Sequence, residues 1–257
     1  MHSILLKIGP LTIYTYGFMI ALGVIMAFLL SMRQAKLYGL DADEMFNLGT
    51  VGIVAGIIGA KVFYLIVELP DIINNPSLLL DVSNGFVVFG GLVFGFLAPY
   101  IYCRKKKIRF LPYLDTAVPQ VALAQGFGRI GCFFAGCCYG KVTHAWYGVV
   151  FPENTQGPGG VPLIPTQLIS SFLDFLLAFM LAGIHKKDGT AGRTTSCYLI
   201  LYSAGRFLVE YLRGDPRGNV GVFSTTQFFT LFSFGAGILL FIITGKQSSA
   251  SREEKKV

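Results

Sequence analysis

Long runs of apolar residues, separated by short segments that carry most of the charges, dominate this chain. Each run is close to the roughly 20 residues that an α-helix needs to cross the hydrocarbon core of a bilayer. The runs are predicted as about seven membrane-spanning helices: Leu11–Leu30, Phe46–Val67, Gly85–Cys103, Pro112–Gly131, Gln167–Ile184, Thr194–Leu212 and Gln227–Gly245. The pattern therefore predicts an all-α polytopic membrane protein.

The composition excludes an ordinary soluble domain. Hydrophobic residues make up 53% of the chain and charged residues only 14%, and the mean hydropathy is +0.62. A soluble globular domain has about a quarter of its residues charged, because its surface must face water. The low content of charged residues and the long apolar runs thus both indicate a membrane protein.

The basic residues are distributed unevenly between the loops. Most of them fall on one side of the predicted helices: Arg33, Lys36, Arg104, Lys105, Lys106, Lys107, Arg109, Lys186, Lys187, Arg193, Lys246, Arg252, Lys255 and Lys256. The other side carries Lys7, Lys141, Arg213 and Arg217. Because cytoplasmic loops are enriched in lysine and arginine, we expect the N-terminus outside and the C-terminus in the cytoplasm. Topology then accounts for the net charge of +7, and no nucleic-acid partner is expected.

We expect a single transmembrane domain over residues 1–247, with outward loops near 68–84 and 141–165. Residues 248–257, which read SSASREEKKV, are predicted to be a disordered cytoplasmic tail. Small residues at four-residue spacing predict close helix packing: Gly52 with Gly56, and Gly91 with Gly95.

Charged residues inside the predicted spans mark the candidate site. A charge at membrane depth costs a few kcal/mol or more, so it is a functional hypothesis by default. Arg206 and Glu210 share a helix face and can form an internal salt bridge. Alternatively, Arg129 and Arg206 converge on an anion while Glu210 holds one of them, and a lipid phosphate is the obvious anion in a bilayer. Lys61 could join this cavity or extend to the membrane interface.

Several segments resemble the phosphatidylglycerol–prolipoprotein diacylglyceryl transferase family. They are IGPLTIYTYGFMIALG, GIIGAKVFY, GGLVFG, GFGRIGCFFAGCCYG, PTQL, YSAGRFLVEYLRGD and the neighbourhood of Ser224 and Gln227. The match runs from the N-terminus to the last predicted span. The resemblance implies a bacterial inner-membrane enzyme that moves a diacylglyceryl group from phosphatidylglycerol to the cysteine thiol of a prolipoprotein lipobox. It implies no cofactor. The alternatives are a paralogue with another acceptor or lipid donor, and a non-catalytic lipid-binding membrane protein.

The resemblance also assigns roles to residues. Those expected to be catalytic are Arg129, Arg206, Glu210 and Tyr202. Those expected to bind the lipid are Tyr16, Lys61, Gly90, Gly91, Gly140 and Gln167. The chain departs from the family at Phe89, where the family has the histidine proposed as its catalytic base. Phenylalanine cannot accept a proton. The acceptor thiol then either needs only the electrostatic help of the two arginines to ionise, or gives its proton to Glu210, Tyr202 or Cys137, which the sequence does not rank.

Three cysteines stand close together near the end of the fourth predicted span, and their role stays open. Cys132, Cys137 and Cys138 are most simply small packing residues, with a disulfide or redox pair as the second interpretation and metal binding as the third. Their spacing is not a recognised zinc pattern, so no metal is expected. Cys132 and Cys137 could meet only if the helix ends between them, which Gly136 permits. His144 and His185 are expected at the surface.

Overall fold

The computed structural model describes residues 4–9, 11–75, 85–153, 155–216 and 218–254, and these form two compact units. Unit 1 comprises Met1–Ser31 and Leu114–Val257, and unit 2 comprises Met32–Tyr113. Two long helices run through the boundaries: α1 (Thr15–Leu37) and α5 (Phe110–Ala135). The single domain expected over residues 1–247 stays a prediction.

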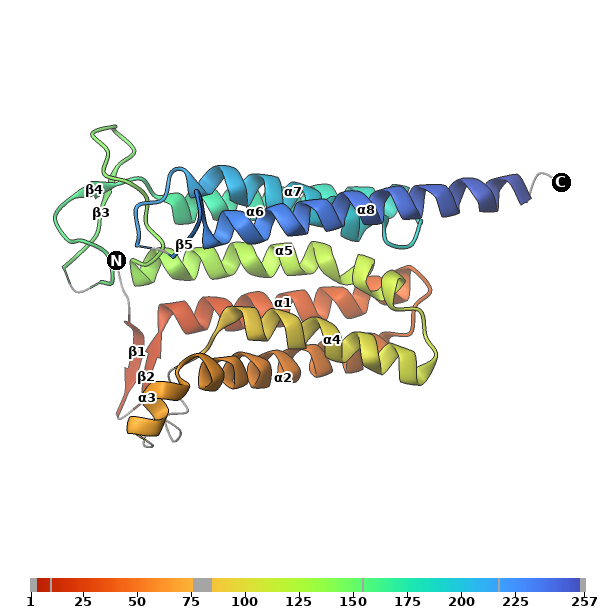
Figure 1. The fold of residues 1–257 in the computed structure, drawn as a ribbon, viewed down its shortest axis with the longest axis horizontal. Helices are drawn as coiled ribbons and strands as arrows, with labels where there is room; N and C mark the ends of the chain where they lie inside the picture. The colour runs from red at the N-terminus through yellow and green to blue at the C-terminus, as the bar shows by residue number, and fades with distance from the viewer. Residues whose placement is uncertain (1–3, 10, 76–84, 154, 217, 255–257) are drawn as a thin grey trace. The chain divides into compact units, whose positions relative to one another are not determined.

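Unit 1 is a set of long helices that lie side by side, with hairpins at one end (Figure 1). Its helices besides α1 and α5 are α6 (Thr166–Lys187), α7 (Arg193–Glu210) and α8 (Thr225–Glu254). Three antiparallel hairpins join β1 (Ile4–Ile8) to β2 (Leu11–Tyr14), β3 (Val149–Val150) to β4 (Pro162–Leu163), and β5 (Asn219–Val220) to β6 (Phe223–Ser224). A core of Ala122, Leu177, Ala178 and Leu181 packs α5 against α6.

Unit 2 is built on α2 (Ala42–Val67) and α4 (Val88–Lys106), with the short α3 (Leu69–Asn74) after α2. The predicted glycine packing is confirmed here. A Cβ on Gly52 would lie 3.4 Å from the carbonyl oxygen of Gly95, and one on Gly56 would lie 3.4 Å from that of Gly91. An added Cβ would therefore touch the backbone of the facing helix, which shows that α2 and α4 approach closely at these glycines.

A buried polar network joins the starts of α5 and α7 to the end of α6. The Asp115 carboxylate accepts hydrogen bonds from the backbone nitrogens of Gly192 and Thr195 and from the Thr195 hydroxyl, so it caps the first turn of α7. His185 lies between the hydroxyls of Thr116 and Thr194, at 3.2 and 3.1 Å. The expectation that His185 lies at the surface is wrong. Although two lysines follow it, its position on α6 turns it into the core.

Each predicted span falls on one helix, with differences at the ends. Residues 11–14 form β2 rather than the start of a helix. Within the described residues, four helices are long and apolar enough to cross a membrane: α1, α2, α6 and the Thr225–Lys246 part of α8. The count of seven spans and the orientation of the termini stay predictions.

Two predicted irregular segments contain helix. The outward loop near 68–84 holds α3 in its first part, while its residues 76–84 lie outside the described residues. Helix α8 continues to Glu254 and extends past α6 and α7 (Figure 1). The disorder expected from Ser248 onward stays a prediction. The polar residues of this end are compatible with helix, because Ala, Arg and Glu are good helix formers.

Candidate functional site

A cavity of about 140 Å³ lies in unit 1, where α5, α6 and α7 meet. Its polar lining comes from Arg129 of α5, Ser170 and Asp174 of α6, and Tyr202 and Arg206 of α7. The rest of the lining is apolar or lacks a side chain: Leu173, Leu176, Leu177, Met180, Leu201, Gly205 and Val209. An engineered protein cavity of about 150 Å³ binds benzene, so this cavity has room for a group of about that size. It thus suits a small polar group of a ligand rather than a whole lipid.

Arg206 is buried and is held from one side. Its Nη2 lies 2.9 Å from Oε2 of Glu210, one helical turn later, so the predicted salt bridge is present. Its Nη1 is buried and has no hydrogen-bond partner among the described residues. A buried donor without an acceptor costs about 1–3 kcal/mol, and more when it is charged. The Arg206 guanidinium is therefore fixed by Glu210 while one of its donors remains available to an acceptor.

Glu210 is itself held by the start of α8. Its Oε1 accepts a hydrogen bond from the Ser224 hydroxyl at 2.9 Å. The same hydroxyl accepts from the backbone nitrogen of Gln227 at 3.2 Å, and the Gln227 side chain accepts from the Ser224 nitrogen at 3.1 Å. This reciprocal pair is a capping box at the N-terminus of α8. The position of Arg206 is thus determined by two helices rather than by one side chain.

Arg129 reaches the same cavity from α5. Within the described part of the chain it has no carboxylate at ion-pair distance and no hydrogen bond, although it lies close enough to Tyr202 and Asp174 to interact electrostatically. A guanidinium keeps its charge in a low-dielectric site and binds phosphate or carboxylate oxygens with two parallel donors. The cavity therefore brings together two arginines whose donors are not fully used.

Asp174 is the residue that sequence reasoning missed in this cavity. It is buried on α6 and lies within electrostatic reach of both Arg129 and Arg206. Its carboxylate offsets part of the positive charge that two arginines would otherwise concentrate in one apolar enclosure. The signal was available, because a single acid within the apolar run QLISSFLDFLL meets the same criterion that identified Arg129.

Two tyrosines lie beside the arginines in different ways. Tyr202 lines the cavity and stacks on Tyr198, with ring centroids 5.4 Å apart, and the Tyr198 hydroxyl donates to Gln125 at 3.0 Å. Tyr16, on α1, is close enough to Arg129 for electrostatic interaction, and it packs against α5 where Gly131 leaves room. The structure thus brings the predicted catalytic residues Arg129, Tyr202, Arg206 and Glu210 together, with Tyr16 adjacent.

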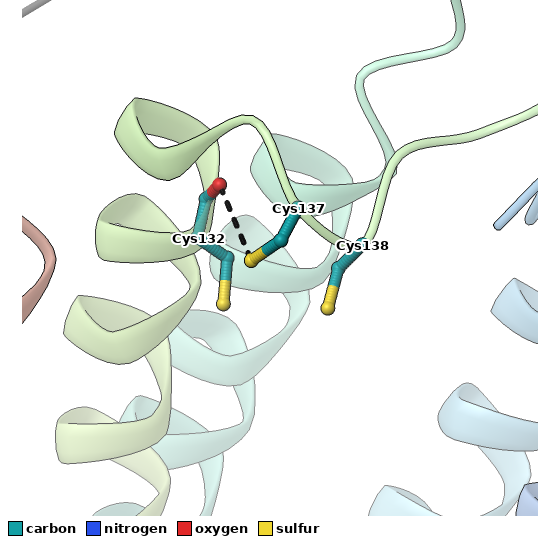
Figure 2. A group of neighbouring side chains, drawn as sticks. All are labelled: Cys132, Cys137 and Cys138. Atoms are coloured by element: carbon teal, nitrogen blue, oxygen red, sulfur yellow. Dashed lines mark hydrogen bonds between the residues drawn. The ribbon is translucent and has the colours of Figure 1, made fainter. Parts of the chain in front are cut away.

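The segment after α5 turns the chain back upon itself. Gly136 has a φ of +72°, a left-handed conformation that glycine adopts without strain, and it ends the helix directly after Ala135. Cys137 and Cys138 consequently return toward Cys132, and the three Sγ atoms lie within 4.8 Å of one another (Figure 2). The helix therefore ends between Cys132 and Cys137, which is the condition for these two side chains to meet. None of the chain's cysteines forms a disulfide in the part that the structure describes.

Residues at the start of α6 and after α7 fix this cysteine segment. Thr166 donates to the carbonyl oxygen of Cys138 and Gln167 to that of Cys137, both at 2.8 Å. Arg213 is expected to be a loop charge, but the structure shows it buried. It donates two hydrogen bonds to the Asp215 carboxylate, at 2.8 and 2.7 Å, and it also interacts with Cys138. Hydrogen bonds with the Cys132 and Cys137 thiols, together with the charge of Arg213, lower the pKa of the Cys138 thiol.

The remaining predicted lipid-binding residues have structural explanations of their own. Gly140 packs where a Cβ would lie 2.6 Å from the carbonyl oxygen of Ile164. Gly90 and Gly91 belong to unit 2, where Gly90 approaches the carbonyl oxygen of Gly59 on α2. Lys61 lies over the rings of Tyr64 and Phe86, at 4.9 and 5.4 Å from the centroids. Their roles in lipid binding, like that of Gln167, stay predictions.

Comparison with known proteins identifies one family. The family model described as "Prolipoprotein diacylglyceryl transferase" matches residues 3–243. A phosphatidylglycerol–prolipoprotein diacylglyceryl transferase of Clostridium tetani is 49% identical over 243 residues, which cover 95% of this chain and 98% of the relative. The phosphatidylglycerol–prolipoprotein diacylglyceryl transferase 2 of Clostridium perfringens is 44% identical over 256 residues, which cover 99% of this chain and 100% of the relative. The phosphatidylglycerol–prolipoprotein diacylglyceryl transferase of Clostridioides difficile is 30% identical over 256 residues, which also cover 99% of this chain and 100% of the relative.

Proposed function

The chain belongs to the prolipoprotein diacylglyceryl transferase family, and we propose that it moves a diacylglyceryl group from phosphatidylglycerol to a lipobox cysteine thiol. The sulfur forms a bond to the glyceryl carbon while the bond between that carbon and the phosphate oxygen breaks. The bonding electrons leave with glycerol phosphate, and the thiol gives up its proton. The product is a prolipoprotein that carries a diacylglyceryl thioether.

The observation that carries this proposal is the pair of arginines in one cavity. Arg129 has no ion pair or hydrogen bond within the described chain, and Arg206 presents a buried Nη1 without a partner. A phosphodiester in this position would accept from both guanidinium groups. Because negative charge grows on the departing phosphate oxygen, these contacts strengthen in the transition state, which is the condition for them to accelerate the reaction.

The surroundings of the cavity favour a lipid over a soluble phosphate. Leu173, Leu176, Met180 and Leu201 line it and are themselves exposed, so the lining continues onto the apolar outer surface of α6 and α7. At membrane depth such a surface faces acyl chains rather than water. A phospholipid can place its phosphate between the arginines and leave its tails outside, which fits a cavity of about 140 Å³.

The other site residues have supporting roles in this proposal. Glu210 holds Arg206 in position through the ion pair at 2.9 Å, and Asp174 partly balances the charge of the two arginines before the lipid arrives. Tyr202 offers a hydroxyl donor at the cavity wall. Tyr16, Lys61, Gly90, Gly91, Gly140 and Gln167 complete the predicted lipid-binding set.

We also propose the finer topology: seven spans, the N-terminus outside, the C-terminus in the cytoplasm, and residence in the bacterial inner membrane. The protein is a multi-pass membrane protein, and the loop charges support this orientation. It would place the segment of Cys137 and Cys138 at the outer face, where a prolipoprotein presents its lipobox.

The function is tested by incubating the purified protein with phosphatidylglycerol and a synthetic lipobox peptide. The expected result is a peptide whose mass has increased by one diacylglyceryl group, detected by mass spectrometry. A peptide with serine in place of the cysteine is the matched control and should stay unmodified. A folded protein that binds the lipid and modifies neither peptide would contradict the proposal.

The replacement of the family histidine by Phe89 favours one alternative, a transferase that uses another acceptor or another lipid donor. The same assay distinguishes it. Modification of the lipobox peptide with phosphatidylglycerol as the donor excludes the alternative, whereas diacylglyceryl transfer that occurs only with a different phospholipid, or only to another nucleophile, supports it. Binding of phosphatidylglycerol without any turnover would instead indicate a lipid-binding protein.

A further inference from the structure

The three cysteines after Arg129 do not line the cavity described above, yet they are arranged like metal ligands. Cys132 belongs to the last turns of α5, and Cys137 and Cys138 follow the helix end, with their side chains directed to a common space (Figure 2). Their Sγ atoms all lie within 4.8 Å of one another. Zinc–sulfur bonds are about 2.3 Å long, so sulfurs around one tetrahedral zinc lie about 3.8 Å apart. Small side-chain rotations would be enough to reach that separation.

The backbone of this segment is held in the conformation that makes the sulfurs converge. Cys138 has a φ of +62°, which non-glycine residues adopt rarely and at a cost of about 1 kcal/mol or more. The hydrogen bonds from Thr166 and Gln167 to the carbonyl oxygens of Cys138 and Cys137 stabilise it from α6. Such support fixes ligands before the ion binds, which is what a metal site requires.

The charges around the cluster suit a bound thiolate group. Three cysteine thiols that bind a divalent ion release their protons and form a unit with a net charge of −1. Arg213 interacts with Cys138 from one side, and Arg129 interacts electrostatically with Cys132 and Cys138 from another. A disulfide, the competing interpretation, would remove this negative charge and leave one cysteine beside two arginines.

We propose that Cys132, Cys137 and Cys138 bind one zinc ion, and that its fourth coordination position takes the acceptor thiol as a thiolate. Structural zinc sites have four protein ligands, whereas sites with three keep a position for water or substrate. The described cluster provides three. A thiol that coordinates zinc is deprotonated outright, which would supply the activation that Phe89 cannot.

The position relative to Arg129 fits this role. Arg129 and Cys132 are three residues apart on α5, so their Cβ atoms lie about 5–6 Å apart on one face. A thiolate on the zinc would then stand next to a phosphodiester held by Arg129. Its sulfur attacks the glyceryl carbon, the carbon–oxygen bond to the phosphate breaks, glycerol phosphate leaves with the electron pair, and the proton released on coordination passes to water. This step rests on the proposed function.

The first test measures zinc binding and does not depend on catalytic activity. Full-length protein is purified in detergent under reducing conditions, exchanged into metal-free buffer, titrated with zinc, and analysed for bound zinc by mass spectrometry. We expect about one zinc per chain in the native protein and in the matched controls Cys103→Ala and Cys197→Ala, whose thiols lie elsewhere. Cys137→Ser and Cys138→Ser should bind zinc at least about 100-fold more weakly.

The second test asks what occupies the fourth position. Cobalt replaces zinc, and its absorption bands report thiolate coordination. A lipobox peptide should change these bands, while the peptide with serine in place of cysteine should not. Zinc binding that is absent, or equal in the native protein and Cys137→Ser, would overturn the site. Cobalt bands that are unchanged by the cysteine peptide would overturn the acceptor role.

The outcomes also separate this inference from the proposed function. A protein that binds zinc through these cysteines but never modifies a lipobox peptide contradicts the transferase function and leaves the metal site standing. A protein whose Cys137→Ser variant transfers the diacylglyceryl group at the native rate contradicts the zinc-activated acceptor alone.

Discussion

Arg206 and Glu210 form a buried ion pair at 2.9 Å, and the pair leaves Nη1 of Arg206 without a hydrogen-bond partner in the described part of the chain. A pair that served stability alone would be expected to use its donors within the protein, since each buried donor without an acceptor costs free energy. The arrangement instead holds a charged donor at the wall of a cavity. It is the structural basis for the predicted phosphate site.

Replacing Glu210 with glutamine should lower stability and turnover together. The substitution keeps the shape of the side chain but leaves Arg206 without its counter-charge, and removing one partner of a buried pair costs about 3–5 kcal/mol. Phosphatidylglycerol should then restore part of the lost thermal stability, because its phosphate supplies the missing charge. Diacylglycerol, which lacks the phosphate, is the control lipid. Equal stabilisation by both lipids would contradict a phosphate beside Arg206.

Arg129→Lys and Arg206→Lys should each reduce diacylglyceryl transfer about 100-fold while the protein remains folded. Lysine keeps the charge but cannot bind two phosphate oxygens with parallel donors. The rate is measured with the lipobox peptide, and Arg33→Lys, at an exposed position, is the matched control. If both cavity variants turned over as fast as the control, the arginines would have no role in the chemistry.

Gly205→Leu should block the cavity without disturbing the helix. Gly205 lines the cavity, and a Cβ added there would have no atom within 4 Å, so a larger side chain would project into the space proposed for the phosphate. Gly183→Leu is the control, because Gly183 also has open space and is not part of the lining. We expect the apparent KM for phosphatidylglycerol to rise at least about tenfold in Gly205→Leu only, a loss equivalent to about 1.4 kcal/mol of lipid binding. An unchanged KM would place the headgroup elsewhere.

Asp115→Ala should affect stability and leave the chemistry intact. Its carboxylate accepts three hydrogen bonds at the start of α7, from Gly192 and Thr195, and their loss would leave buried donors unpaired at a cost of about 1–3 kcal/mol. Thermal unfolding in detergent measures the cost, and the rate per folded molecule is the second readout. A large fall in that rate at a temperature where the variant is folded would show that the network does more than cap the helix.

Much of the fold could be predicted from the sequence because hydrophobic runs determine membrane helices directly. The same reasoning found Arg129 and Arg206, since a charge in an apolar run is conspicuous. Asp174 satisfied that rule and was still missed. His185 is buried although the next two residues, Lys186 and Lys187, are exposed, because successive residues of a helix occupy different faces. Arg213 follows α7 closely in the chain, and only the structure shows that it is buried against Asp215.

The cysteine cluster could not be predicted from spacing. On a continuous helix Cys132 and Cys137 would point in different directions, and only the reversal at Gly136 brings Cys137 and Cys138 back to Cys132. That reversal depends on support from Thr166 and Gln167, which follow much later in the chain. Contacts of this kind are set by tertiary packing, which local sequence patterns do not encode.

The central claim is that one cavity holds the phosphate of phosphatidylglycerol while its glyceryl carbon is transferred to a thiol. The most direct measurement quantifies glycerol phosphate and the thioether peptide in the same reaction. We expect the two products to appear in equal amounts, to depend on the peptide cysteine, and to fall together in Arg129→Lys and Arg206→Lys. Glycerol phosphate released without thioether, or thioether formed at the native rate in both variants, would contradict the account.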